Sequence, residues 1–116
     1  MMHYLLSYEV AADYFERRTE YRGQHLQLAW EAADRGELIL GGVVGDPGES
    51  ALLLFWSDSP EVAARFARSD PYVQHGLVTR WTVKPWHTVA GLNCATPIRP
   101  GTGNQLSVDK SAGSGS

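Results

Sequence analysis

Three residues of this chain have side chains and spacings suited to proton-transfer chemistry. His25 lies in the apolar stripe of a predicted helix, where an imidazole held against a hydrophobic wall could act as a general base. Arg22 precedes it by about one turn and could bind an anionic substrate group. Asp70 comes directly before Pro71, where a second predicted helix ends. A carboxylate at that point could approach the first helix, hydrogen-bond His25, fix its tautomer and stabilise its protonated form.

Each of these residues also has an ordinary structural explanation. A histidine in an apolar helical stripe is typical of a hydrogen-bonded group in a protein core. An arginine at the edge of such a stripe can cover apolar surface while its charged group stays in water. An aspartate before a proline commonly forms a turn. Spacing alone therefore leaves both explanations open for His25, Arg22 and Asp70.

Other reaction chemistries have weaker support in the sequence. The glycine-rich stretch 41–48 leads into a strand and lacks the Gly-Lys-Ser/Thr sequence of a phosphate-binding loop, so it indicates strand packing and a turn. Cys94 is the only cysteine, which excludes an intrachain disulfide, and it lies outside the periodic part of the chain. We predict no metal site, because four histidines lack short metal-ligand spacing: His3, His25, His75 and His87.

Composition indicates one folded domain. The chain has 116 residues, 43% hydrophobic and 20% charged, with a formal net charge of -3. This mild acidity gives no electrostatic footprint for nucleic acid or an anionic membrane. The N-terminus lacks the pattern of a signal peptide, and the apolar run 51–56 is too short to span a bilayer. We expect a cytoplasmic protein with neither nucleic-acid nor membrane partners.

Hydrophobic periodicity predicts alternating strands and helices. The predicted strands are residues 3–10, 38–44, 51–56 and 79–86, with a turn at 45–50 joining the second strand to the third. The predicted helices run from about 13 to 35 and from a cap at Ser59 to about 69. A loop or turn at 71–77 precedes the last strand. Residues 1–91 form the predicted domain, and residues 92–116 read as a Gly/Ser/Pro-rich tail.

The order βαββαβ predicts a ferredoxin-like α+β fold, in which two helices cover one face of a four-stranded antiparallel sheet. The strand at 51–56 carries Leu52, Leu54 and Trp56 on one face, with Leu53 and Phe55 on the other. The face without helices would therefore expose a large apolar patch in a monomer. We predict that a second copy of the chain covers this face.

Several short motifs together resemble those of the YciI-like (YCII-related) proteins. They are Arg22-Gly-Gln-His25-Leu26, Gly41-Gly42, Asp70-Pro71-Tyr72 and Trp81-Thr-Val83-Lys-Pro85-Trp86. The resemblance covers about residues 3–91. It implies a dimeric α+β barrel, in which two subunits pack sheet to sheet. It also implies a pocket with a His-Asp pair, which falls here on His25 and Asp70.

The resemblance further implies a reaction class. A dehydrochlorinase that acts on a chlorinated hydroxyquinol is similar to this family, so acid-base elimination or isomerisation is implied. In that interpretation Arg22 and Gly42 bind the substrate, and Tyr72 and Trp86 line the pocket. Two positions depart from many relatives. Gly42 is followed by a valine where they have proline, which would reshape the pocket wall, and His75 stands where they have a small residue.

Our leading hypothesis is a small homodimeric enzyme, independent of any cofactor, that uses His25 and Asp70 for acid-base chemistry on a cyclic or aromatic substrate. The main alternative is a non-catalytic ligand-binding or accessory module, in which the pair merely satisfies a buried histidine. An oxygen- or haem-using protein is a third possibility, which the absence of a clear ligand motif disfavours.

Overall fold

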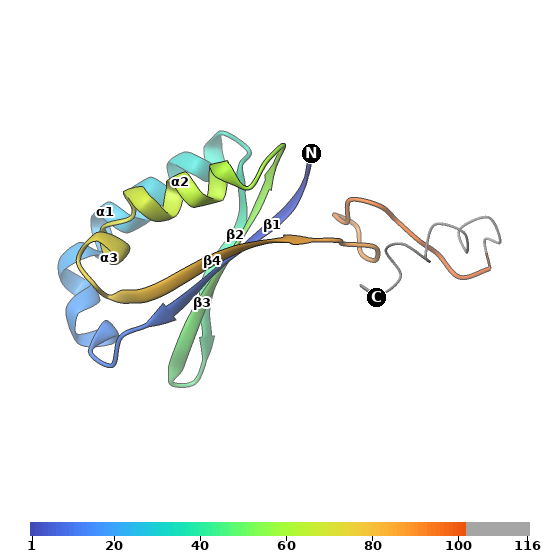
Figure 1. The fold of residues 1–116 in the computed structure, drawn as a ribbon. Helices are drawn as coiled ribbons and strands as arrows, with labels where there is room; N and C mark the ends of the chain where they lie inside the picture. The colour runs from blue at the N-terminus through green and yellow to red at the C-terminus, as the bar shows by residue number, and fades with distance from the viewer. Residues whose placement is uncertain (102–116) are drawn as a thin grey trace.

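The computed structural model describes residues 1–101 and has a sheet with all its helices on one face (Figure 1). The sheet order is β2-β3-β1-β4, and each neighbouring pair is antiparallel. The strands are β1 (Met2–Val10), β2 (Leu38–Gly45), β3 (Gly48–Ser57) and β4 (Val78–Trp86). The helices are α1 (Tyr14–Asp34), α2 (Glu61–Ser69) and α3 (Pro71–Gln74). The predicted ferredoxin-like α+β fold is confirmed.

Two connections differ from the sequence-based prediction. The turn expected at 45–50 is shorter, because Gly45 pairs with Gly48 and the strands continue up to them. Gly45 has a φ of 104°, a conformation that glycine adopts without steric cost. The loop expected at 71–77 contains the single helical turn α3. This turn forms because Pro71 occupies the first helical position and the Asp70 side chain accepts the Tyr72 N–H.

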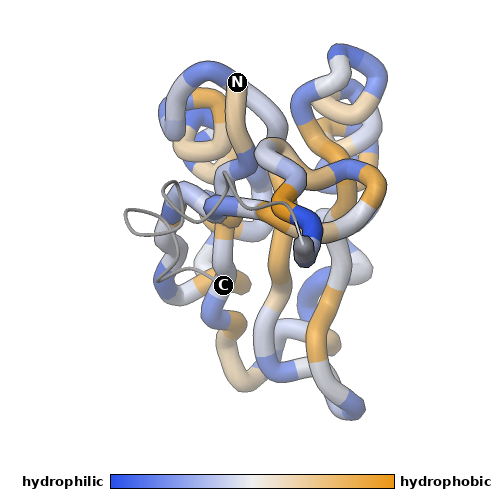
Figure 2. Tube along the Cα trace, turned by 90° about the vertical axis from the view of Figure 1, so that its right-hand side faces the viewer, coloured by the Kyte–Doolittle hydropathy of each residue, from blue (hydrophilic) through white to orange (hydrophobic). Residues whose placement is uncertain are grey.

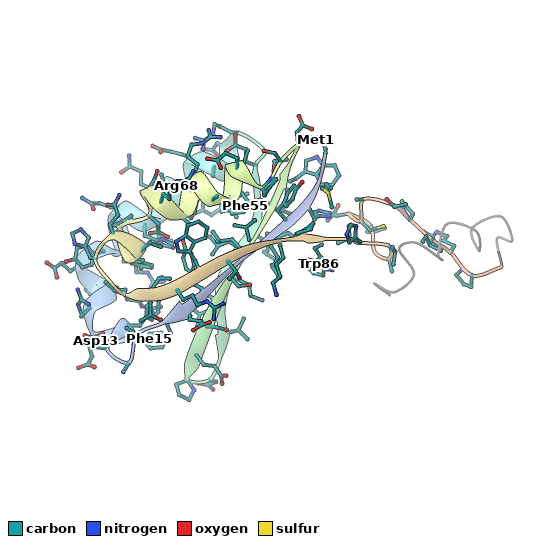
Figure 3. All side chains as sticks on the ribbon, viewed as in Figure 1. Met1, Asp13, Phe15, Phe55, Arg68 and Trp86 are labelled. Carbon is teal, nitrogen blue, oxygen red and sulfur yellow. The ribbon has the colours of Figure 1, made fainter. Side chains whose placement is uncertain are left out.

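The core lies between the sheet and the helices. Tyr4, Leu6 and Tyr8 alternate along β1 and point to the helix-covered face, as the period-two pattern predicts. Phe55 on β3 lies beneath α2 in Figure 3, where its ring centroid is 5.4 Å from that of Phe66. In Figure 2 the hydrophobic stretches run along the strands, whereas the helices alternate between hydrophobic and hydrophilic residues. This alternation is typical of helices that bury one side.

The helix-free face of the sheet carries the apolar side chains that motivated the predicted second subunit. Leu54 of β3 lies opposite Leu5 of β1 and Leu40 of β2. Leu52 is 37% exposed and Leu54 is half-buried. The homodimer stays a prediction.

Beyond β4 the chain extends away from the sheet (Figure 1). Thr88 anchors the start of this extension, because its hydroxyl lies 2.8 Å from His3 Nδ1 and accepts the Ala95 N–H at 2.8 Å. Residues 102–116 of the predicted tail lie outside the described residues. Within residues 1–101 no helix is both long and apolar enough to cross a membrane.

Candidate active site

A histidine and an aspartate from different elements meet beneath α1. His25 lies in the second half of α1, and Asp70 joins α2 to α3. His25 Nδ1 lies 2.9 Å from Asp70 Oδ1 and 3.0 Å from Oδ2. The Asp70 side chain is fully buried, and the His25 side chain is 15% exposed. The structure thus brings together the two residues that the sequence paired.

Three donors from three elements satisfy the Asp70 carboxylate. Besides His25, the Tyr8 hydroxyl of β1 donates to Oδ2 at 2.7 Å, and the Tyr72 N–H of α3 donates to Oδ1 at 3.0 Å. A buried carboxylate without such donors would be costly. The arrangement also fixes Asp70 in place, because one of its oxygens caps α3. The same carboxylate therefore holds a loop together and orients an imidazole.

This arrangement sets the His25 tautomer. An ionised carboxylate can only accept hydrogen bonds, so the His25 Nδ1 atom that faces it carries a proton. In the neutral ring the lone pair is then on Nε2. Within residues 1–101 Nε2 has no hydrogen-bond partner. The Tyr72 ring stacks on the imidazole, with centroids 4.0 Å apart and planes at 11°, which restrains the ring further.

Two tyrosines near the pair keep their protons well above neutral pH. Burial raises the pKa of the Tyr8 phenol far above its usual value, and the adjacent Asp70 charge raises it further. Tyr8 is therefore protonated at neutral pH and donates to Asp70. Burial also raises the pKa of Tyr72 to about 12, although the positive charges of Arg22 and Arg18 lower it.

A cavity of about 460 Å³ lies between α1 and β2, large enough for a small ring compound. His25, Arg22, Gly42 and Tyr72 all line it, so four of the six predicted site residues share one cavity. Asp70 does not line it and lies behind His25. The remaining wall is largely apolar and includes these residues of α1, β2 and β3: Leu26, Ala29, Trp30, Leu38, Ile39, Leu40, Val43, Ala51 and Leu53.

Trp86 lies away from this cavity. It pairs with His3 at the end of β4, 47% exposed, close to the start of the C-terminal extension in Figure 3. Asp13 and Phe15, near the start of α1, lie at the opposite end of the molecule (Figure 3). His75 does not join the pair either; its ring stacks on Tyr21 with centroids 4.3 Å apart.

The sequence interpretation missed two residues of the site. Tyr8 was recognised only as part of the predicted strand at 3–10, although a buried phenol requires a hydrogen-bond partner and so signals a nearby acceptor. Arg18 lines the cavity together with Arg22. The sequence could have indicated Arg18, because it precedes Arg22 by four residues and so lies on the same side of α1.

A ferredoxin-like sheet with a cavity beside a hydrogen-bonded His-Asp pair defines a small α+β protein with one polar site between α1 and β2. The YCII-related domain model matches residues 1–87, and the chain belongs to that family. No curated protein matches the chain.

Two solved structures share the fold. One is 5-chloro-2-hydroxyhydroquinone dehydrochlorinase (TftG) from Burkholderia phenoliruptrix in complex with 2,5-dihydroxybenzoquinone. It is 18% identical, with a TM-score of 0.61 over 73% of this chain and 93% of that one. The other is protein Atu4242 from Agrobacterium tumefaciens, 13% identical, with a TM-score of 0.51 over 83% of this chain and 99% of that one.

Proposed function

We propose that this protein is an enzyme, independent of any cofactor, in which His25 removes a proton from a small cyclic or aromatic substrate. One observation carries the proposal: the imidazole in the cavity wall is bound through Nδ1 to a buried carboxylate, and Nε2 has no protein partner within residues 1–101. A histidine with that tautomer has its basic nitrogen free for substrate. Membership of the YCII-related family and the likeness of the fold to TftG support this reaction class.

The proposed step is a proton abstraction. A C–H or O–H bond of the substrate breaks, its proton moves to His25 Nε2, and its electron pair forms a new C=C or C=O bond. In an elimination a leaving group such as chloride departs with its bonding electrons, and the imidazolium returns its proton to water. In an isomerisation an existing π bond of the substrate breaks as the new one forms, and its electron pair takes the proton back from the imidazolium at another carbon. Asp70 stabilises the imidazolium while it exists.

Other predicted site residues have supporting roles in this proposal. Arg22 binds an anionic group of the substrate, because it lines the same cavity one turn before His25. The Tyr72 ring stacks on the imidazole, and Gly42, which has no side chain, forms part of the β2 wall of the cavity. Trp86 has no role in this cavity.

We also propose that the chain forms a homodimer through the helix-free face of the sheet. The apolar row of Leu5, Leu40 and Leu54 supports this assembly, because water-exposed apolar patches of this kind favour association. Sedimentation equilibrium tests it. The wild-type chain should have twice the monomer mass, and Leu54→Glu should have the mass of one chain.

The tautomer can be tested without a substrate. Long-range proton–nitrogen NMR should show that neutral His25 carries its proton on Nδ1 in the wild-type protein. In Asp70→Ala the proton should move to Nε2, the position that free imidazole side chains prefer in water. An Nε2–H tautomer in the folded wild-type protein would remove the physical basis of the proposed base.

Turnover tests the proposal directly. The first probe is 5-chloro-2-hydroxyhydroquinone, followed by chloride release, and the second is a set of cyclic enols and hydroxyquinones, followed by deuterium exchange in heavy water. His25→Asn retains an N–H near the position of Nδ1 but removes Nε2, so it should abolish turnover. His87→Asn, a change at an exposed histidine, should not.

The non-catalytic alternative predicts a different outcome. In that case ring compounds would bind the cavity without chloride release or deuterium exchange. His25→Asn would then change only binding or stability, and the His-Asp pair would serve to join α1 to the loop before α3.

A further inference from the structure

The cavity is positively charged. Arg18 and Arg22 both line it, and none of the lining residues carries a carboxylate. Other arginines of the chain pair with acidic side chains, for example Arg35 with Glu37. Within residues 1–101, however, neither Arg18 nor Arg22 forms an ion pair. The two guanidinium groups thus lack a counter-charge beside a cavity that could hold one.

The two arginines and the base lie in one row along α1. Arg18 and Arg22 are separated by four residues and His25 follows three residues later, so all three occupy one side of the helix at successive turns. The Arg18 guanidinium lies 4.7 Å from the centroid of the Phe15 ring, a contact that restrains its orientation. An anion held by these arginines would therefore lie one to two helical turns from the imidazole.

The opposite end of the row is apolar. Leu26 and Trp30 follow His25 on α1, and Leu38 and Ile39 line the same cavity from β2. These side chains are partly exposed, with Trp30 at 67%. The cavity therefore changes along α1 from charged to apolar, with the imidazole between the two ends.

We infer that the substrate is a flat apolar carboxylate, whose carboxylate group binds Arg18 and Arg22 while its ring reaches past His25 toward Leu26 and Trp30. The position of the reacting carbon beside His25 rests on the proposed function, whereas the binding of the carboxylate by the two arginines does not. Planar guanidinium groups match carboxylate oxygens in pairs, and two of them can bind one carboxylate from both sides. The apolar wall selects a hydrocarbon ring rather than a small inorganic anion.

The test compares an acid with its neutral amide. Isothermal calorimetry on the full chain would measure the binding of 2-naphthoate and of 2-naphthamide, which have nearly the same shape. We expect 2-naphthoate to bind at least about tenfold more tightly than the amide. Arg18→Gln and Arg22→Gln should each weaken 2-naphthoate binding by about tenfold to a hundredfold, because each removes hydrogen bonds to a charged group.

Arg65→Gln is the matched control. It makes the same chemical change at an exposed arginine of α2 that does not line this cavity, and it should leave both affinities unchanged. The inference is wrong if acid and amide bind equally, or if Arg18→Gln and Arg22→Gln behave like the control. Tighter binding of 2-naphthyl phosphate than of 2-naphthoate would also overturn the assignment to a carboxylate.

One further variant separates this inference from the proposed function. His25→Asn keeps both arginines, so it should still bind 2-naphthoate at least about tenfold more tightly than 2-naphthamide. If the acid binds well but no turnover or Nδ1–H tautomer is found, the proposed function fails and the inference stands. If turnover is found without preference for the acid, only the inference fails. Thermal unfolding of each variant confirms that the arginine changes leave the fold intact.

Discussion

The two long helices cover the same face of the sheet in different ways. In the nine residues of α2, Ala63, Phe66 and Ala67 are buried against the sheet. In the 21 residues of α1, only Tyr14 and Ala32 are buried. α2 therefore closes the core with small and aromatic side chains that pack directly.

The stripe of α1 that faces the sheet instead carries polar and charged side chains. Arg18, Arg22 and His25 lie along it, and the space between α1 and β2 remains a cavity of about 460 Å³. In this fold α2 therefore contributes mainly to stability, whereas α1 packs less closely and positions polar side chains. Variants of the two helices should therefore affect different properties.

The largest expected effect is on turnover by the α1 variant His25→Asn. Removing a positioned general base should lower kcat by about 10²–10⁴-fold. The unfolding free energy should change little, since the asparagine N–H can still donate to Asp70. Steady-state kinetics and urea unfolding on the same preparation would check both. If His25→Asn instead greatly lowered the unfolding free energy, the main role of His25 would be structural, like that of the buried residues of α2.

The next effect concerns Tyr8, which links the sheet to the polar group beneath α1. Tyr8→Phe removes a hydrogen bond to a buried carboxylate and should cost about 1.5–3 kcal/mol of unfolding free energy. Tyr4→Phe is the matched control, because Tyr4 is also buried on β1 but its hydroxyl has no partner within residues 1–101. Equal urea midpoints for the two variants would contradict this role of Tyr8.

An alanine-to-leucine substitution on each helix tests the difference between α1 and α2 directly. Ala63→Leu on α2 adds volume to a closely packed core and should cost about 1–3 kcal/mol, with no change in the ligand affinity of the folded protein. Ala29→Leu on α1 places the same volume in the cavity wall. It should lower ligand affinity at little cost in stability. Stability would be measured by urea unfolding and ligand affinity by calorimetry. The assignment of the helices is wrong if Ala29→Leu lowers stability and Ala63→Leu lowers ligand affinity.

The smallest effect is a loss of stability at alkaline pH. Folding raises the pKa of Tyr72 from 10.0 to about 12, so the unfolded chain releases this proton first. The stabilisation is fully present below pH 10 and is lost as the pH rises through 12. At pH 11 the loss from Tyr72 should be about 1 kcal/mol. Urea midpoints measured from pH 8 to 11 should fall, and Tyr72→Phe should reduce the fall.

The fold was predictable because its apolar residues repeat with clear periods. The alternation of Tyr4, Leu6 and Tyr8 with the residues between them predicted the first strand, and the strand and helix order then allowed few topologies. The helix α3 was not predicted, because four residues are too few to show a helical period. It depends on the cap from Asp70, a local hydrogen bond to the Tyr72 N–H that hydrophobic periodicity does not reveal.

The His25–Asp70 pair was predictable from topology together with the family resemblance. Tyr8 and Arg18 were missed, because Tyr8 fits the alternation of a strand and Arg18 fits a helix surface. Only the folded structure shows that Tyr8 donates to Asp70 and that Arg18 lines the cavity. The placement of Trp86 away from the cavity follows from strand parity. Trp81 and Trp86 are five residues apart on β4, so they point to opposite faces of the sheet.

The position of β2 at the edge of the sheet has an evolutionary consequence. β2 pairs only with β3 within the described residues, yet Leu38, Gly41 and Val43, which pair with core residues of β3, line the cavity. No atom of the hydrogen-bonded group around Asp70 comes from this strand. Substitutions in β2 can therefore reshape the cavity without altering the hydrogen bonds between His25 and Asp70. Paralogues of this chain could diverge in the molecules they accept by changing one wall and conserving the other.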